Sequence, residues 1–464
     1  RDFNLHTGDM SNVVKAGVWL YLGTTIGGLF GLIYWVLMSR LVGVEAVGRV
    51  GAVVAFATLI QVIFSLDIGL GLARSVGVAL RNGDWTSISR HFWTGVTYLL
   101  SAGAGIWLAL FLANAGVEWG LFSPLLALIF NLSLLADMLL AALYLSWVRV
   151  LAMAASGVAL IAVGVSLASW GWVGAAVGYT SGAAVYAALL TAYAIRRVGF
   201  ARPSFAMWIE MAKAGVSRWG PSTLLTAGQQ AGILGVYHLS GAPDSGRLYI
   251  AQAIAGVVAS FGTMALWLAT PTLARAARRR ELALYGSKVA LALTSPLSVA
   301  LAAGAELPLS ILGHEYAAAR QVFSVLALSV PAQVFTNVAA SYLLSEAMYR
   351  RVFTLYATYT ATAAAAYMAL IPQLGALGAA TATLAASTAA ALTAAVFLKP
   401  SQKHLKAVAL PLAIGVLTWH LPPPIATAAA LSTYAIYLKA GVWTRQEITN
   451  IIKTILQKQT GDII

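Results

Sequence analysis

The segment Lys15-Ala16-Gly17-Val18 returns as Lys213-Ala214-Gly215-Val216, 198 positions further along the chain. At the same offset, Gly48-Arg49 falls on Gly246-Arg247. Later the offset becomes 204, so that Gly171 and Gly174 fall on Gly375 and Gly378. Echoes that keep the same order over such a distance indicate an internal duplication.

The duplicated segments are strongly apolar. The 464 residues are 60% hydrophobic and only 9% charged, with a mean hydropathy of +0.82, whereas about a quarter of the residues of a soluble domain are charged. Apolar stretches of about twenty residues are long enough to cross a bilayer as helices. We therefore predict an all-α polytopic membrane protein with fourteen transmembrane helices, over residues 16–39, 49–73, 91–113, 124–146, 151–170, 173–194, 216–239, 247–273, 289–311, 321–345, 352–371, 374–397, 405–421 and 423–440.

The duplication divides these spans into three parts. We predict an N-terminal six-helix bundle over 1–200, a C-terminal six-helix bundle over 201–400, and an appended helix pair with a cytoplasmic tail over 401–464. Because each bundle has an even number of spans, both have the same orientation and an axis along the membrane normal relates them. Parallel repeats of this kind are typical of transporters, which bind their cargo between the halves.

Positive charge is distributed unequally between the two sides of the predicted spans. Of the 29 lysines and arginines, 25 fall on one side, and only Arg40, Arg49, Arg247 and Arg320 fall on the other. The positive-inside rule therefore places both termini in the cytoplasm, as expected for a multi-pass protein of the plasma membrane. The same distribution accounts for the net charge of +14, so we expect no nucleic-acid partner.

Several classes of chemistry are disfavoured. The chain has no cysteine, and its six histidines form no close pair, so we expect no thiol chemistry and no bound metal. A phosphate-binding glycine loop followed by Lys-Ser/Thr is missing from the sequence, which argues against ATP hydrolysis. The predicted outer loops are short and have no paired acids, in contrast to membrane glycosyltransferases. We expect neither enzymatic activity nor a cofactor.

Polar side chains that share a helix face inside the membrane are candidates for substrate binding, because burying them there costs free energy. The seventh span has one such face and the tenth has another, and the candidates on them are Arg218, Ser222, Gln229, Gln333 and Asn337. The alternative is that they form hydrogen bonds between helices that only hold the bundle together. Pro221 lies inside the seventh span and predicts a kink or a broken turn there. Residues 205–213 form either a separate interfacial helix or an inward extension of this span.

Two carboxylates fall within the predicted spans. Asp67 and Arg74 are seven residues apart and share a face of the second span, so they can pair, while Asp137 lies on the fourth span. Each carboxylate can be a structural ion pair, a proton carrier or a cation ligand, and coupling to H⁺ or Na⁺ is therefore open. Arg74 and Arg218 are candidates for substrate binding, with snorkelling to the inner interface as the alternative.

Three of the rare outer cations complete the candidate substrate site. They are Arg40, Arg49 and Arg247, and the last two occupy equivalent positions in the repeat. The duplication places these two symmetrically about the expected cleft. Arginines around a cavity favour phosphate or carboxylate cargo, because the guanidinium forms paired hydrogen bonds with such groups.

Four segments of the chain carry a family resemblance. They are Ser39-Arg40-Leu41-Val42-Gly43-Val44-Glu45-Ala46-Val47-Gly48, Leu66-Asp67-Ile68-Gly69-Leu70 with Ala73-Arg74, Ile311-Leu312-Gly313-His314-Glu315-Tyr316 and Gly375-Ala376-Leu377-Gly378-Ala379-Ala380. In this order and spacing they resemble polysaccharide exporters of the MOP (multidrug/oligosaccharidyl-lipid/polysaccharide) superfamily. The resemblance implies a flippase that moves undecaprenyl- or dolichyl-diphosphate-linked sugars between leaflets by alternating access. It also implies that the appended helix pair forms a groove for the lipid tail, as in the similar lipid II flippases, which have fourteen spans.

The leading hypothesis is therefore a flippase for a polyprenyl-(di)phosphate-linked oligosaccharide or polysaccharide unit. Its partners would be membrane lipid and the lipid-linked glycan, and we expect it to act as a monomer. The alternative is a cation-coupled multidrug antiporter of the same superfamily. That branch typically has twelve spans, with an acid in the first span of some members, whereas residues 16–39 contain no acid. An integral membrane glycosyltransferase is the least favoured hypothesis.

Overall fold

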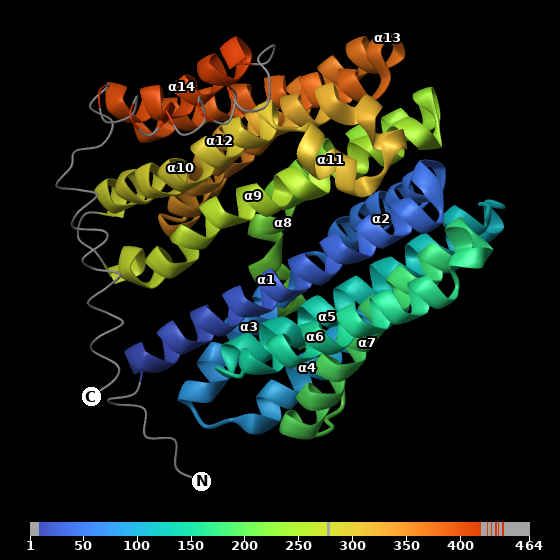
Figure 1. Cartoon of the computed structure of the whole chain (residues 1–464). Coiled ribbons are helices and arrows are strands. Elements are labelled where there is room, and N and C mark those ends of the chain that lie inside the picture. Colours follow the sequence, from blue (N-terminus) through green and yellow to red (C-terminus); the bar gives the residue numbers. More distant parts are fainter. Residues whose placement is uncertain are drawn as a thin grey trace, which may run out of the picture.

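The computed structural model describes residues 9–275 and 279–418, together with residues 425, 428, 432, 433, 435 and 439. These residues form helices joined by short turns, with no β-strand among them (Figure 1). Nine helices in this part of the chain are long and apolar enough to cross a membrane. The prediction of an all-α polytopic membrane protein is confirmed. The count of fourteen spans and the side of each terminus stay predictions, and the predicted span 423–440 lies almost wholly outside the described residues.

The first half of the chain contains seven long helices, one more than predicted, because the second predicted span is broken. Two short helical turns, η1 (Glu118–Phe122) and η2 (Ala168–Trp170), precede the fifth and seventh helices. The long helices are α1 (Asp9–Leu41), α2 (Gly43–Ser65), α3 (Ile68–Arg81), α4 (Trp85–Leu112), α5 (Ser123–Ala142), α6 (Trp147–Ser166) and α7 (Trp172–Val198).

The second half follows the same plan with different breaks. Its elements are α8 (Phe205–Ser240), α9 (Ala242–Arg275), α10 (Arg279–Ala303), α11 (Glu306–Leu312), the short turn η3 (His314–Ala319), α12 (Arg320–Ser345), α13 (Tyr349–Leu398) and α14 (Gln402–Thr418). Residues 205–213 are the first part of the continuous helix α8 and not a separate helix. Helix α8 runs through Pro221 without a broken turn, contrary to one of the two expectations for that residue.

The backbone repeats at the positions that the sequence repeats. Gly171 has φ 62° and ψ −134°, and its counterpart Gly375 has φ 56° and ψ −129°. Gly43 and Gly241 likewise both have positive φ, at 83° and 94°. Residues other than glycine rarely adopt such backbone angles. The glycine echoes therefore mark turns of the same shape in the two copies.

Helices of the same half pack closely on each other. Helix α6 packs between α1 and α7, while α12 packs against α9, α10 and α13, and α14 covers α10 and α12. Between the halves, α2 packs against α8 and α9, and α3 packs against the first turns of α8. In Figure 1 the α1–α7 group and the α9–α14 group lie on opposite sides of an oblique seam. Among the helices of the first half, α2 makes the most extensive contact with the second half.

Candidate functional site

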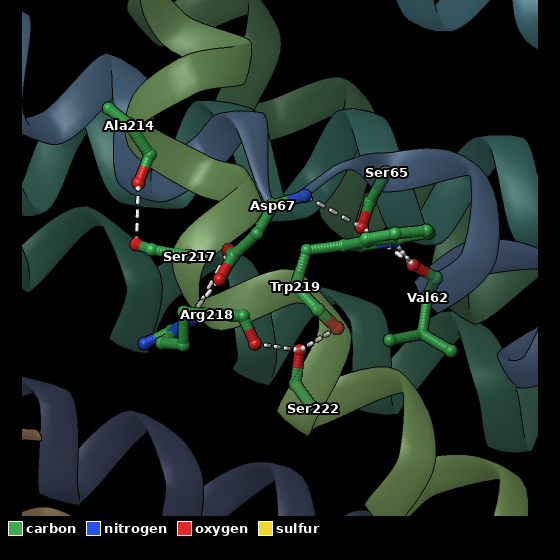
Figure 2. A network of polar contacts seen from close by, with 8 residues as sticks. All are labelled: Val62, Ser65, Asp67, Ala214, Ser217, Arg218, Trp219 and Ser222. Atoms are coloured by element: carbon green, nitrogen blue, oxygen red, sulfur yellow. Dashed lines mark hydrogen bonds and ion pairs between the residues drawn. The ribbon is translucent and has the colours of Figure 1, made fainter. Parts of the chain in front are cut away.

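Polar groups of both halves meet at the helix break between α2 and α3. Leu66 and Asp67 both have left-handed backbone angles, with φ of 47° and 49°, a conformation that non-glycine residues rarely adopt. The break leaves carbonyl groups at the end of α2 without partners inside their own helix. The indole Nε1 of Trp219 on α8 donates to the Val62 carbonyl at 2.9 Å (Figure 2). It also donates to the Ile63 carbonyl at 3.0 Å.

An ion pair joins this break to α8. The Arg218 guanidinium donates from Nε to one carboxylate oxygen of Asp67 at 2.5 Å and from an Nη atom to the other at 3.2 Å (Figure 2). The Asp67 side chain is 9% exposed and that of Arg218 is 42% exposed. The Ser65 hydroxyl also accepts a hydrogen bond from the Asp67 amide at 3.2 Å. The carboxylate is therefore held in place, while part of the guanidinium stays accessible.

Backbones approach closely behind the ion pair. A Cβ at Gly215 of α8 would lie 2.6 Å from the carbonyl oxygen of Asp67, closer than real Cβ atoms come. A Cβ at Gly71 of α3 would lie 2.7 Å from the Cα of Met211. Only glycine fits at these two positions without a shift of backbone. Gly215 belongs to the repeated Lys-Ala-Gly-Val segment, so in this copy the segment serves to seat α8 on the break.

The other inner candidates lie around this pair. Arg74 is exposed and lies near the carboxylate of Glu210. Asp67 pairs with Arg218 and not, as the sequence had suggested, with Arg74. The Ser222 hydroxyl donates to the Arg218 carbonyl of its own helix at 3.0 Å, and Gln229 is exposed. Of the inner candidates, Arg218 is thus the one that the structure brings into the seam with a carboxylate partner.

Glu210 is a site residue that the sequence did not single out. Its carboxylate accepts a hydrogen bond from the Ser75 hydroxyl at 2.8 Å and lies 3.4 Å from Nε2 of the buried His91. The Ser75 hydrogen bond, with a smaller contribution from His91 and Arg74, lowers the pKa of Glu210 below its usual value. This cluster ties the start of α8 to α3 and α4.

Asp137 has a partner that the helix-face analysis missed. An Nη atom of Arg149 on α6 donates to its carboxylate at 2.6 Å, and another reaches the Thr24 hydroxyl of α1 at 3.3 Å. The Asp137 side chain is 9% exposed. All these groups belong to the first half of the chain. In this conformation Asp137 is therefore in an ion pair within one bundle, one of the three interpretations that its sequence left open.

The three outer arginines all contact groups of the protein itself. Arg40 donates to the Ile311 carbonyl at 2.7 Å. Arg49 lies 2.9 Å from Glu45 and 3.6 Å from Glu118. Arg247 pairs with Asp244 at 2.8 Å and donates to the Glu315 carbonyl at 3.2 Å. The Arg40 contact crosses from the first half to the second. The Arg247 contact reaches η3, just before α12, within the second half. These arginines therefore help to hold this end of the structure together.

At the end of the seam that the topology prediction places outside, the two halves meet in a self-complementary glycine contact. A Cβ at Gly48 of α2 would overlap the Ala242 carbonyl oxygen and lie 2.8 Å from the Gly246 nitrogen. A Cβ at Gly246 of α9 would overlap the Val44 carbonyl oxygen and lie 3.0 Å from the Gly48 nitrogen. Val44 and Ala242 are repeat equivalents, as are Gly48 and Gly246. Each copy therefore offers the other the same surface, as a two-fold axis requires.

The tenth-span candidates bond within their own helix, α12. Gln333 donates to the Ser329 hydroxyl at 2.7 Å, and the Ser341 hydroxyl donates to the Asn337 carbonyl at 2.9 Å. Both Gln333 and Asn337 are half-buried. Neither of these hydrogen bonds connects Gln333 or Asn337 to Arg218 or to the outer arginines.

A cavity of about 170 Å³ lies between α1 and α9. Its walls are apolar, and none of the candidate arginines is among the residues that line it, which are Gly28, Gly31, Leu32, Trp35, Ile250, Ala253, Ile254, Val257 and Leu312. The expected cation-lined cleft is thus different from this cavity. The arginines instead gather at the two ends of α2. Within the described ranges, no three His, Asp or Glu side chains are placed to hold a metal ion.

The fold is that of known MOP-superfamily transporters. A lipid II flippase, MurJ, in an inward closed conformation matches 95% of this chain and 99% of its own, with a TM-score of 0.70 and 14% identity. An inward-facing multidrug resistance MATE family transporter matches 84% of this chain and 98% of its own, with a TM-score of 0.61 and 15% identity. A MOP superfamily transporter from Pyrococcus furiosus matches 85% and 96%, with a TM-score of 0.60 and 13% identity. No family model and no curated protein matches the sequence.

Proposed function

We propose that the chain is a flippase of the MOP superfamily that moves a polyprenyl-(di)phosphate-linked oligosaccharide or polysaccharide unit across the plasma membrane. The observation that carries this proposal is the extent of the structural match. The lipid II flippase spans 95% of the chain, whereas the multidrug transporters match nearly all of their own length and leave part of this chain unmatched. A chain with an appended helix pair gives such a difference.

The chemistry of the seam supports an anionic cargo. Arg218 is fixed at the break between α2 and α3, and its side chain keeps 42% of its surface exposed. A guanidinium presents a planar fork of donors that matches phosphate as well as carboxylate. A diphosphate group entering between the halves would meet this fork first on the inner side, where the topology prediction places Arg218.

The contacts between halves suit an alternating-access cycle. The predicted outer end is closed by the Gly48–Gly246 crossing and by the hydrogen bond from Arg40 to the Ile311 carbonyl, and a rocking motion of 1–200 against 201–400 would separate both contacts. Arg49 and Arg247, whose partners lie within their own halves, would then flank the opened crossing and guide the diphosphate out. Rocking of parallel repeats about a site between them is a general transporter mechanism.

A cation-coupled multidrug antiporter is the second candidate. The match to the MATE transporter favours it, since the shared fold extends over 84% of the chain. The two intramembrane carboxylates that would serve such a transporter, Asp67 and Asp137, are each paired with an arginine of the chain in this conformation. A coupling cation would have to replace those arginines, which makes the antiporter the weaker proposal.

The test compares two arginines in a transport assay. Neutralising Arg218 (Arg218→Gln) is expected to lower the rate of lipid-linked sugar translocation by about tenfold or more, since each 1.4 kcal/mol of lost binding is a factor of ten. The control is Arg350→Gln at an exposed position on α13, which should leave the rate unchanged. Equal effects of the two changes would remove Arg218 from the substrate site.

A further inference from the structure

The partner that Arg218 has in this conformation competes with any anionic cargo. Asp67 engages the guanidinium through two donors, at 2.5 and 3.2 Å. A phosphate group would use the same fork in the same geometry. The two interactions therefore exclude each other at those donors, and a phosphate must displace the carboxylate to bind there in full.

The two partners differ in how far they are accessible. The Asp67 side chain is 9% exposed and is held at the helix break, while the Arg218 side chain is 42% exposed. Tyr356 on α13 lies close enough to Arg218 to interact with its charge. Arg218 therefore stands where α8, α13 and the break between α2 and α3 meet. An anion can reach the guanidinium from its exposed side, and the carboxylate lies behind it.

Release of Arg218 would also loosen the seam. Three ties hold α8 to the break, namely the ion pair, the indole hydrogen bonds of Trp219, and the close backbone contact at Gly215. The ion pair is the one tie that an anion can take over. A ligand that binds only when a contact is broken shifts the population toward the state in which that contact is open.

We propose that Asp67 is an internal competitor that occupies the diphosphate site on Arg218 and closes the seam until a diphosphate ester displaces it. This inference rests on the proposed function for the identity of the cargo. The competition itself involves only a diphosphate group and Arg218, so it does not depend on the sugar. It also assigns Asp67 a role opposite to that of a substrate-binding or cation-binding residue, because removing its charge should strengthen the binding of the anion.

The experiment measures binding of two probes to the full-length protein in nanodiscs by titration calorimetry. The probes are inorganic pyrophosphate and farnesyl diphosphate. Asp67→Asn is expected to tighten binding by about tenfold, and Arg218→Gln is expected to abolish saturable binding. The control variant is Glu306→Gln, which removes a carboxylate from Arg320, an arginine of similar exposure at 39%. It should leave both affinities unchanged.

Each outcome decides the proposal. Tighter binding of both probes to Asp67→Asn supports it for any diphosphate, and tighter binding of farnesyl diphosphate alone supports it for a lipid-linked one. Unchanged or weaker binding to Asp67→Asn overturns it, as does equal tightening by Glu306→Gln. If Asp67→Asn does not fold, Asp67→Ser in the same titration takes its place. Because neither probe carries a sugar, a failure of glycan transport would leave this result standing, and the two claims fail separately.

Discussion

Replacing Gly48 by alanine tests whether the crossing of α2 and α9 is the outer closure. The added Cβ would lie 2.7 Å from the Ala242 carbonyl carbon and 2.8 Å from the Gly246 nitrogen. These are backbone atoms, which cannot move aside as the end of a flexible side chain can. Overpacking of this kind costs about 1–3 kcal/mol. Because the clash exists only while the crossing is closed, that cost shifts the equilibrium toward the open state by about 5- to 150-fold.

The assay uses the chain's lack of native cysteine. Val44 is 7% exposed and its side chain faces Gly246 in the crossing. A Val44→Cys reporter should react slowly with a membrane-impermeant maleimide in the parent protein. When Gly48→Ala is added, the reporter should react about 5- to 150-fold faster. Gly246→Ala should have a similar effect, because the contact is reciprocal.

Two controls separate opening from other effects. Gly77→Ala on α3 adds a Cβ that meets no atom within 4 Å, and it should leave the labelling rate of Val44→Cys unchanged. A cysteine at Leu139 of α5, which is fully buried and is not part of the Gly48–Gly246 contact, should stay unreactive in Gly48→Ala. Equal labelling rates in Gly48→Ala and Gly77→Ala would refute the closure. Labelling of the Leu139 reporter would show unfolding in place of opening.

Three further outcomes are expected in thermal unfolding. Trp219→Phe removes the indole donor to the end of α2 and should lower the free energy of unfolding by about 1 kcal/mol; no loss would show that these carbonyls find other partners. Asp137→Asn or Arg149→Gln alone should each cost about 3 kcal/mol by leaving a charge unpaired, and the double variant should cost less than their sum; additive costs would contradict the pair. Because the pKa of Glu210 is lowered, its stabilising contribution is present above its ordinary value of 4.5 and is lost as pH falls through the lowered pKa. Glu210→Gln should therefore reduce the loss of stability below about pH 4.5, and an unchanged pH profile would exclude this contribution.

The features that could be predicted from the sequence depend on local or additive signals. Apolar length and low charge suffice to identify helices that cross a membrane. The glycine echoes indicated equivalent turns, and Gly171 and Gly375 do share nearly the same backbone angles. Gly48 and Gly246 were recognised as equivalent, but their direct contact depends on how the two copies face each other, which the sequence does not encode locally.

The features that were missed depend on contacts distant in sequence. Neither Leu66 nor Asp67 is a glycine or proline, so the strongest local signals of a helix break are missing at these two positions. The indole of Trp219 and the close approach of α8 stabilise it from outside. The break also changes the direction of the Asp67 side chain relative to a continuous helix. The pairing with Arg74 that a continuous helix predicts is therefore replaced by the pair with Arg218.

Transport by the purified protein in liposomes would identify the cargo most directly. The protein would be reconstituted with a polyprenyl-diphosphate-linked oligosaccharide, and transfer of the sugar between leaflets would be followed with a lectin or glycosidase that cannot cross the membrane. We expect transfer above that of protein-free liposomes, with loss of transfer in Arg218→Gln. Liposomes that instead extrude cationic drugs along an ion gradient, and leave the lipid-linked sugar in place, would contradict it.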